Sequence, residues 1–234
     1  TYVKTENFAA VRAIQEDILN AYALDFAKHA PTDQIMKINQ VWDTIPSQLA
    51  KENKKFIYSV IRKGARAKEF EVAIQWLLEA GLIHKAYHLK APKLPLAGYV
   101  NTEFFKVYLA DVGLLGAKAK LSAKSIIHGN QLLQEFKGSL TENYAAQALV
   151  RNSHDLYYWT SDGRAEMDFI ICHDDTIYPL EIKSGASNKK KSLQFYGAKY
   201  SPKRMIRCSS MNLKLDGNLL NYPLYLINNL ENFL

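Results

Sequence analysis

The sequence lacks the signals of a membrane protein and of a secreted protein. No run of about eighteen apolar residues occurs in its 234 residues, which excludes an ordinary transmembrane helix. No signal-peptide pattern is present either. Cysteine is scarce: Cys172 and Cys208 both fall among apolar neighbours, which is typical of small core residues in a reducing compartment. We therefore expect a cytoplasmic protein that contacts no membrane.

A phosphate-binding loop is absent too. Nothing in the chain reads G-x-x-x-x-G-K-[ST], and the first residue is Thr1 rather than methionine. The chain is therefore expected to be the C-terminal piece of a longer protein and not to bind ATP itself. What is present is a composition that can bury a core, with 48% hydrophobic residues, and a formal net charge of +7 that favours anionic partners.

Residues 165–185, AEMDFIICHDDTIYPLEIKSG, carry the pattern around which the sequence is organised. Alternating apolar residues predict two strands joined by a turn at residues 173–176. Side chains two apart on a strand share a face, so Glu181 and Lys183 point the same way, and antiparallel pairing brings Asp168 to them. Neighbouring strands lie about 4.8 Å apart, which lets two carboxylates share one hard cation. The alternative is a solvated strand face with a cross-strand ion pair.

The flanking segments predict an ordered set of further elements. They are a helix at 138–151, a strand at 156–160, the two motif strands, a helix at 192–200 and a last strand at 204–209. Glu142 lies on the first helix, on a different face from its apolar residues.

With Asp168 and the Glu181-x-Lys183 triplet, this order resembles the restriction-endonuclease-like superfamily, the PD-(D/E)xK nucleases. The resemblance implies that Asp168 and Glu181 hold Mg²⁺ and that Lys183 stabilises charge on the scissile phosphate or orients water. It also implies that Glu142 assists a ligand or a second ion. Met167 stands where a proline commonly precedes the aspartate in this superfamily. This difference argues neither for nor against catalysis.

A narrower resemblance covers most of the chain. The segments FKVYLADVGLL, FKGSLTENYAAQAL, LYYWTSDGRAEMDFII and YPLEIKSG are similar to the C-terminal half of a prokaryotic AAA-type ATP-binding family. Its proteins carry a domain of unknown function, DUF4143, after the ATPase. The resemblance implies an endonuclease-like DUF4143 domain with a central mixed sheet over residues 134–234. It also implies an N-terminal ATPase portion of the same chain as a partner, with ATP bound only there.

The N-terminal half predicts a helical segment over residues 1–31 and a winged-helix-like domain over 32–116, with a linker at 117–133. Residues 7–29 form an amphipathic helix whose apolar stripe packs either on the following helices or on the ATPase portion. Three helices are expected next, one at 33–45, a second that begins at Pro46 and a third at 67–80. A strand is expected at 55–61, and the two wing strands at 82–89 and 104–110.

Acidic residues argue against DNA binding by the helix expected at residues 67–80. Glu69, Glu71 and Glu79 would be repelled by phosphate, so a packing or partner-docking role is favoured. In the following strand, His84 and His88 share a face but lack a third metal ligand.

No acidic residue occurs from Ser184 to Leu215, where basic residues recur. A phosphate backbone approaching Asp168 and Glu181 would meet these charges first, which predicts nucleic-acid contacts. An ordinary solvated loop is the alternative. The candidate DNA-binding residues are Lys189, Lys190, Lys191, Lys203 and Arg204.

Two functions of different class stay open. The first is a Mg²⁺-dependent phosphodiesterase acting on DNA, a nuclease. The second is a catalytically inactive module that binds nucleic acid or protein and regulates the attached ATPase. The expected fold is α/β (α+β): a winged-helix-like helical domain followed by a restriction-endonuclease-like α/β domain.

Overall fold

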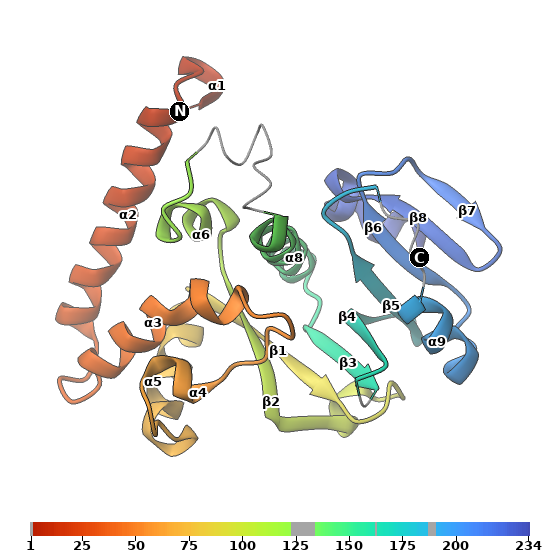
Figure 1. Cartoon of the computed structure of the whole chain (residues 1–234), viewed down its shortest axis with the longest axis horizontal. Helices are drawn as coiled ribbons and strands as arrows, with labels where there is room; N and C mark the ends of the chain where they lie inside the picture. Colours follow the sequence, from red (N-terminus) through yellow and green to blue (C-terminus); the bar gives the residue numbers. More distant parts are fainter. Residues whose placement is uncertain (1, 123–133, 162, 187–190) are drawn as a thin grey trace. The chain divides into compact units, whose positions relative to one another are not determined.

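The computed structural model describes residues 2–122, 134–161, 163–186 and 191–234. Contacts within the chain define two units, Thr1–His84 with Val107–Leu140, and Lys85–Lys106 with Thr141–Leu234. Strands β1 (Ile83–Leu89) and β2 (Val100–Leu109) and helix α8 (Gln134–Arg151) each contain a boundary between the units (Figure 1). The chain therefore passes from one unit to the other inside regular secondary structure.

The first unit is built from helices. Asn7 begins the long helix α2 by accepting hydrogen bonds from the backbone N–H groups of Ala9 and Ala10 at 2.9 and 3.1 Å. The described helices that lie wholly in this unit are α1 (Tyr2–Thr5), α2 (Phe8–His29), α3 (Ile35–Leu49), α4 (Tyr58–Ile61), α5 (Ala67–Glu79) and α6 (Val112–Lys118).

The apolar stripe of α2 is covered only in part. Phe26 is fully buried, and its ring meets the edges of Trp42 on α3 and Trp76 on α5 with centroid distances of 5.7 and 5.5 Å. Ile14 and Ile18 stay 43% and 37% exposed. Packing on the following helices, as expected, thus holds for the C-terminal half of the stripe.

Two sequence-based expectations for this unit were wrong. Residues 55–61 were expected as a strand, but residues 58–61 form the short helix α4. The Gln48 side chain contacts both backbone groups of Ile57, accepting from its N–H at 2.9 Å and donating to its carbonyl at 3.0 Å. This side chain supplies the partners that a neighbouring strand would have supplied. Pro46, expected to begin a helix, lies inside α3.

The described part of the chain contains one eight-stranded mixed sheet, in the order β2-β1-β3-β4-β5-β6-β8-β7. Pairings of β3 with β4 and β4 with β5 are antiparallel, whereas β1–β3, β5–β6 and β6–β8 are parallel. The two expected wing strands are thus part of the same sheet as the motif strands. The remaining elements are β3 (Tyr157–Ser161), β4 (Ala165–His173), β5 (Thr176–Ile182), α9 (Lys191–Tyr200), β6 (Met205–Ser209), β7 (Lys214–Asp216), β8 (Leu219–Pro223), η1 (Leu96–Tyr99) and η3 (Leu224–Phe233).

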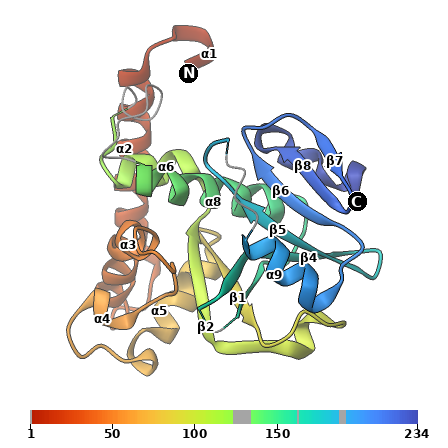
Figure 2. The same cartoon turned by 45° about the vertical axis from the view of Figure 1, so that its right-hand side comes forward.

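Opposite faces of β4 have different chemistry. Met167 packs in a core with Trp159 of β3 and with Leu193 and Tyr196 of α9, which covers this face (Figure 2). Because side chains alternate along a strand, Glu166 and Asp168 point to the other face. Glu166 and Asp168 thus lie on the face of β4 that does not pack on α9.

Both cysteines are free thiols. Burial raises the pKa of Cys208 to about 12, and the nearby Asp168 carboxylate adds to the effect. Within the part of the chain that the structure describes, no helix combines the length and the apolar character needed to cross a membrane.

The β4–β5 turn offers a test of the hairpin. Asp174 and Asp175 both have left-handed backbone angles, with φ of 45° and 54°, as a two-residue type I′ turn requires. Asp175→Gly should raise the free energy of unfolding by about 0.5 kcal/mol, because relief of left-handed strain of about 1–2 kcal/mol exceeds the entropic cost of glycine. Urea denaturation measures this. Asp175→Ala should instead destabilise the protein, and equal effects of both changes would contradict the turn.

Candidate functional site

A register shift in β4 places Asp168 at an irregular position. Trp159 of β3 faces Met167, but Tyr157 faces Ile170, so β4 carries one extra residue between these pairs. On the other side, β4 pairs antiparallel with β5 from His173 opposite Thr176 to Phe169 opposite Leu180, as predicted. Asp168 therefore lies in a bulge just past the end of regular pairing with β5, and such bulges re-aim side chains.

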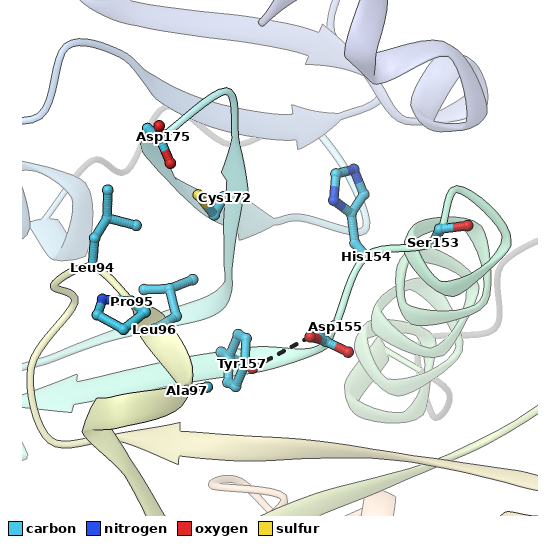
Figure 3. Close-up of a pocket in the computed structure, with 10 residues that line it drawn as sticks. All are labelled: Leu94, Pro95, Leu96, Ala97, Ser153, His154, Asp155, Tyr157, Cys172 and Asp175. Carbon is cyan, nitrogen blue, oxygen red and sulfur yellow. Dashed lines mark hydrogen bonds between the residues drawn. The ribbon is translucent and has the colours of Figure 1, made fainter.

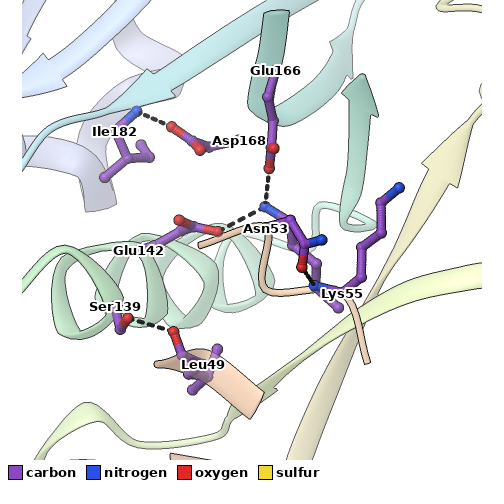
Figure 4. A network of polar contacts seen from close by, with 9 residues as sticks. Leu49, Asn53, Lys55, Ser139, Glu142, Glu166, Asp168 and Ile182 are labelled. Atoms are coloured by element: carbon purple, nitrogen blue, oxygen red, sulfur yellow. Dashed lines mark hydrogen bonds and ion pairs between the residues drawn. The ribbon is translucent and has the colours of Figure 1, made fainter. Parts of the chain in front are cut away.

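The Asp168 side chain takes the place of a backbone partner. Its Oδ2 accepts a hydrogen bond of 2.7 Å from the Ile182 N–H (Figure 4). On the opposite side of β5, the next N–H, that of Lys183, donates to the Cys208 carbonyl of β6 at 2.9 Å. The Asp168 carboxylate is thus fixed at the C-terminal end of β5.

Glu181 and Lys183, two residues apart at the end of β5, form an ion pair with 3.1 Å between Oε1 and Nζ. The Glu181 side chain is 5% exposed and that of Lys183 is 34% exposed. Among the described residues, the buried Oε2 of Glu181 has no hydrogen-bond partner. Asp168 is thus bound to the backbone of the segment that carries Glu181 and Lys183, and one buried oxygen of Glu181 has no protein ligand among the described residues.

Glu142 is engaged elsewhere in the same unit. It extends from α8 and is 3% exposed, and its Oε1 accepts from the ammonium of Lys106 on β2 at 3.0 Å. The same ammonium donates to Glu166 Oε1 at 2.6 Å, so that both glutamates converge on one amino group (Figure 4). In the described residues, no three His, Cys, Asp or Glu side chains form a metal-binding group.

Sequence reasoning missed Lys106 and Glu166. Glu166 could have been found, because it precedes Asp168 by two residues and so shares its face. Lys106 offers no local signal, since 36 and 60 residues separate it from Glu142 and Glu166.

The predicted basic residues divide into three groups. Lys189 and Lys190 lie outside the described residues. Lys191, at the start of α9, and Lys203 are exposed, whereas Arg204 donates a hydrogen bond to the Phe233 carbonyl. Arg207, from the same acid-free stretch, is 1% exposed and donates twice to Asn221 Oδ1, at 2.9 and 2.5 Å. This arginine belongs to the interior and not to a phosphate-facing surface.

His84 and His88, which share a face of β1, lie among other protein groups. His88 Nε2 lies 3.0 Å from Thr160 Oγ1, and burial lowers the pKa of His84.

A pocket of about 570 Å³ lies in the second unit (Figure 3). The Tyr157 hydroxyl is 3.5 Å from Asp155 Oδ2 in its wall, and His154 Nε2 lies 3.2 Å from Glu231 Oε1. It contains none of the predicted site residues. Its lining residues are Leu94, Pro95, Leu96, Ala97, Ser153, His154, Asp155, Tyr157, Cys172 and Asp175.

Comparison with protein families covers both halves of the chain. A family model described as a domain of unknown function, DUF8612, matches residues 1–125, which is more than half of the sequence. The chain belongs to the DUF8612 family. Part of the DUF8612 match, residues 85–106, lies in the second unit and contributes Lys106.

A second model, the domain of unknown function DUF4143, matches residues 137–226. This match confirms the DUF4143 resemblance; the link to an AAA-type ATPase stays a prediction. The match includes Glu142, Asp168, Glu181 and Lys183. No curated protein and no solved structure matches the chain.

His154, which lines the pocket shown in Figure 3, should make the stability of the protein depend on pH. Burial lowers its pKa below the ordinary value of 6.5, and His173 acts the same way, while Glu231 and Asp155 oppose the shift. Below pH of about 6.5 the unfolded chain therefore binds a proton more readily than the folded chain. The melting temperature should fall as the pH drops from 7.5 towards 5.5, and His154→Asn should reduce this fall. The same change at the exposed His29 is the control; an unaltered slope in His154→Asn would contradict the prediction.

Proposed function

We propose that Asp168 and Glu181 hold a Mg²⁺ ion and that the site acts on the phosphodiester backbone of DNA. One observation carries the proposal: the Glu181 Oε2 atom is buried and lacks a partner among the described residues. A buried charged oxygen without a ligand is costly, and a hard cation is its natural partner. Mg²⁺ needs only one or two carboxylates when water and phosphate complete its coordination, so the pair suffices in number.

The chain's own residues would prepare the site. The Ile182 N–H orients the Asp168 carboxylate, and the Lys183 ammonium holds one oxygen of Glu181. Lys183 is partly exposed and donates hydrogen bonds only, so it suits stabilisation of charge on a phosphate oxygen. When bound, Mg²⁺ supplies Lewis-acid polarisation of the phosphate and a more acidic water.

We also propose a specific fold for each half of the chain, from the order of its elements. The succession α8, β3, β4, β5, α9 and β6 supports a restriction-endonuclease-like core, and α3, α4 and α5 followed by β1 and β2 support a winged-helix-like arrangement. In this reading the sequence is the C-terminal part of a prokaryotic AAA-type ATP-binding protein, with ATP bound by the attached ATPase and not by these residues.

A second candidate function is a non-catalytic module that binds nucleic acid or protein and regulates that ATPase. The observation in its favour is that the site acids already have structural partners: Asp168 binds the Ile182 N–H, and Glu181 pairs with Lys183. Ion pairs of this kind also serve as scaffolds.

Replacing Asp168 separates the two functions. Asp168→Asn keeps an oxygen that can accept from Ile182 N–H, so the metal-free melting temperature should be retained or rise slightly. The same change should abolish Mg²⁺-dependent stabilisation and any cleavage of DNA. Asp168→Ala should cost about 1–3 kcal/mol, because it leaves a buried N–H unsatisfied. Thermal melts with and without Mg²⁺, with a DNA cleavage assay, measure these effects.

Two further variants complete this test. Lys183→Ala should keep much of the Mg²⁺ response and lose cleavage, since lysine is not a metal ligand. Asp174→Asn, at a 95% exposed side chain in the β4–β5 turn, is the matched control. It should change neither the Mg²⁺ response nor the cleavage of DNA. If Mg²⁺ never shifts the wild-type melting temperature and Asp168→Asn lowers it markedly, the regulatory module is the better assignment.

DNA binding is tested by its salt dependence. If lysines 189, 190 and 191 each neutralise a phosphate, their replacement by alanine should make the log–log slope of affinity against salt less negative by about 2.7, at roughly 0.9 per contact. Fluorescence anisotropy with duplex DNA measures the slope.

The matched control removes three exposed charges near α5. The triple variant Lys63→Ala, Arg66→Ala, Lys68→Ala makes the same charge change and should leave the slope as in the wild type. A slope that flattens in this control, and not after replacement of lysines 189–191, would move the DNA contacts to the helical unit.

A further inference from the structure

Lys106 is a buried cation shared by two carboxylates. Its side chain is 1% exposed, and its Nζ lies 3.0 Å from Glu142 Oε1 and 2.6 Å from Glu166 Oε1. The ammonium also lies 5.0 Å from the centre of the Tyr158 ring. Burial of an ammonium is unfavourable unless anions surround it, so the two glutamates are what allow Lys106 to be charged inside the protein.

This cluster is next to the proposed ion site. Glu166 precedes Asp168 by two residues on β4, so their side chains leave the same face of the strand about two residue rises apart. Glu142 comes from α8 on that face, as its contact with Lys106 requires. Two acids that converge from different elements onto one point are also the arrangement by which proteins hold divalent cations.

We propose that Lys106 is a built-in cation that occupies the place of a second divalent ion and limits this site to a single exchangeable metal. The proposal rests on the proposed function, because the single ion is the one assigned to Asp168 and Glu181. Lys106 is a positioning residue: it holds Glu142 and Glu166 in place and neutralises part of their charge. Glu142 then acts through Lys106 and is not a metal ligand in the native chain.

Lys106→Met is the direct test, because methionine keeps much of the side-chain length and removes the charge. Without the ammonium, the two glutamates repel each other and form an acidic pair open to a divalent ion. In chelator, the melting temperature should fall below that of the wild type. Mn²⁺ should then raise it by more than it raises the wild type, a divalent-specific rescue that a merely structural lysine would not show.

Ion counting gives the decisive numbers. Equilibrium dialysis or Mn²⁺ EPR should find close to one ion per wild-type chain and close to two per Lys106→Met chain. Lys85→Met is the matched control: Lys85 is on the neighbouring strand β1, with its ammonium 4.4 Å from the Phe105 ring centre. Its count should stay at one. Two ions in the wild type, or no additional ion in Lys106→Met, would overturn the proposal.

The proposed function and this inference fail in different ways. If the wild type binds no ion but Lys106→Met binds one, the Asp168–Glu181 site is wrong and the role of Lys106 stands. If the wild type binds one ion that Asp168→Asn removes, but Lys106→Met gains none, the Asp168–Glu181 site stands and the role of Lys106 is wrong. Should Lys106→Met fail to fold even with Mn²⁺, Glu142→Gln decides. It should keep the wild-type ion, and loss of that ion would make Glu142 a ligand and overturn the inference.

Discussion

The hydrogen bond from the Ile182 N–H to the Asp168 carboxylate joins the charged site to the framework of the sheet. Regular pairing of β4 with β5 stops at Phe169 and Leu180, and the Asp168 side chain continues the connection where the backbone cannot. Because Ile182 lies between Glu181 and Lys183, this bond ties Asp168 to the backbone of the segment that carries both residues. A side chain on a strand is positioned more precisely than one on a loop, which suits the proposed ion site.

Buried charge changes how the composition of this protein should be interpreted. Lys106 and Arg207 both contribute to the formal net charge of +7, yet both are internal and bonded to neighbouring side chains. Glu142 and Glu181 are buried as well, so these internal charges cancel, and the net positive charge comes from the remaining residues. A buried ion pair such as that of Lys106 contributes little net stability, and its contacts give each charged group a defined position.

Local patterns allowed the motif hairpin and the long helix to be predicted from sequence. Alternating apolar residues around an Asp-Asp turn predicted β4 and β5, and an apolar stripe at helical spacing predicted α2. The error lay at residues 55–61, where a strand was expected and where the Gln48 side chain binds both backbone groups of Ile57. The contact of Lys106 with Glu142 joins residues 36 apart, which local patterns do not show. The β4 bulge and the strands β7 and β8 carried too short a pattern to be recognised. The DUF4143 match was foreseen, whereas the metal and DNA assignments stay predictions.

The boundary between the units, which falls within β1, β2 and α8, bears on how far the two family segments depend on each other. Residues 85–106 belong to the DUF8612 match but are part of the same compact unit as the DUF4143 match. A DUF4143 segment separated at residue 137 would expose the edge of β3 and deprive Glu142 and Glu166 of their shared cation. Separating the two family segments there would thus disrupt a compact unit to which both contribute residues.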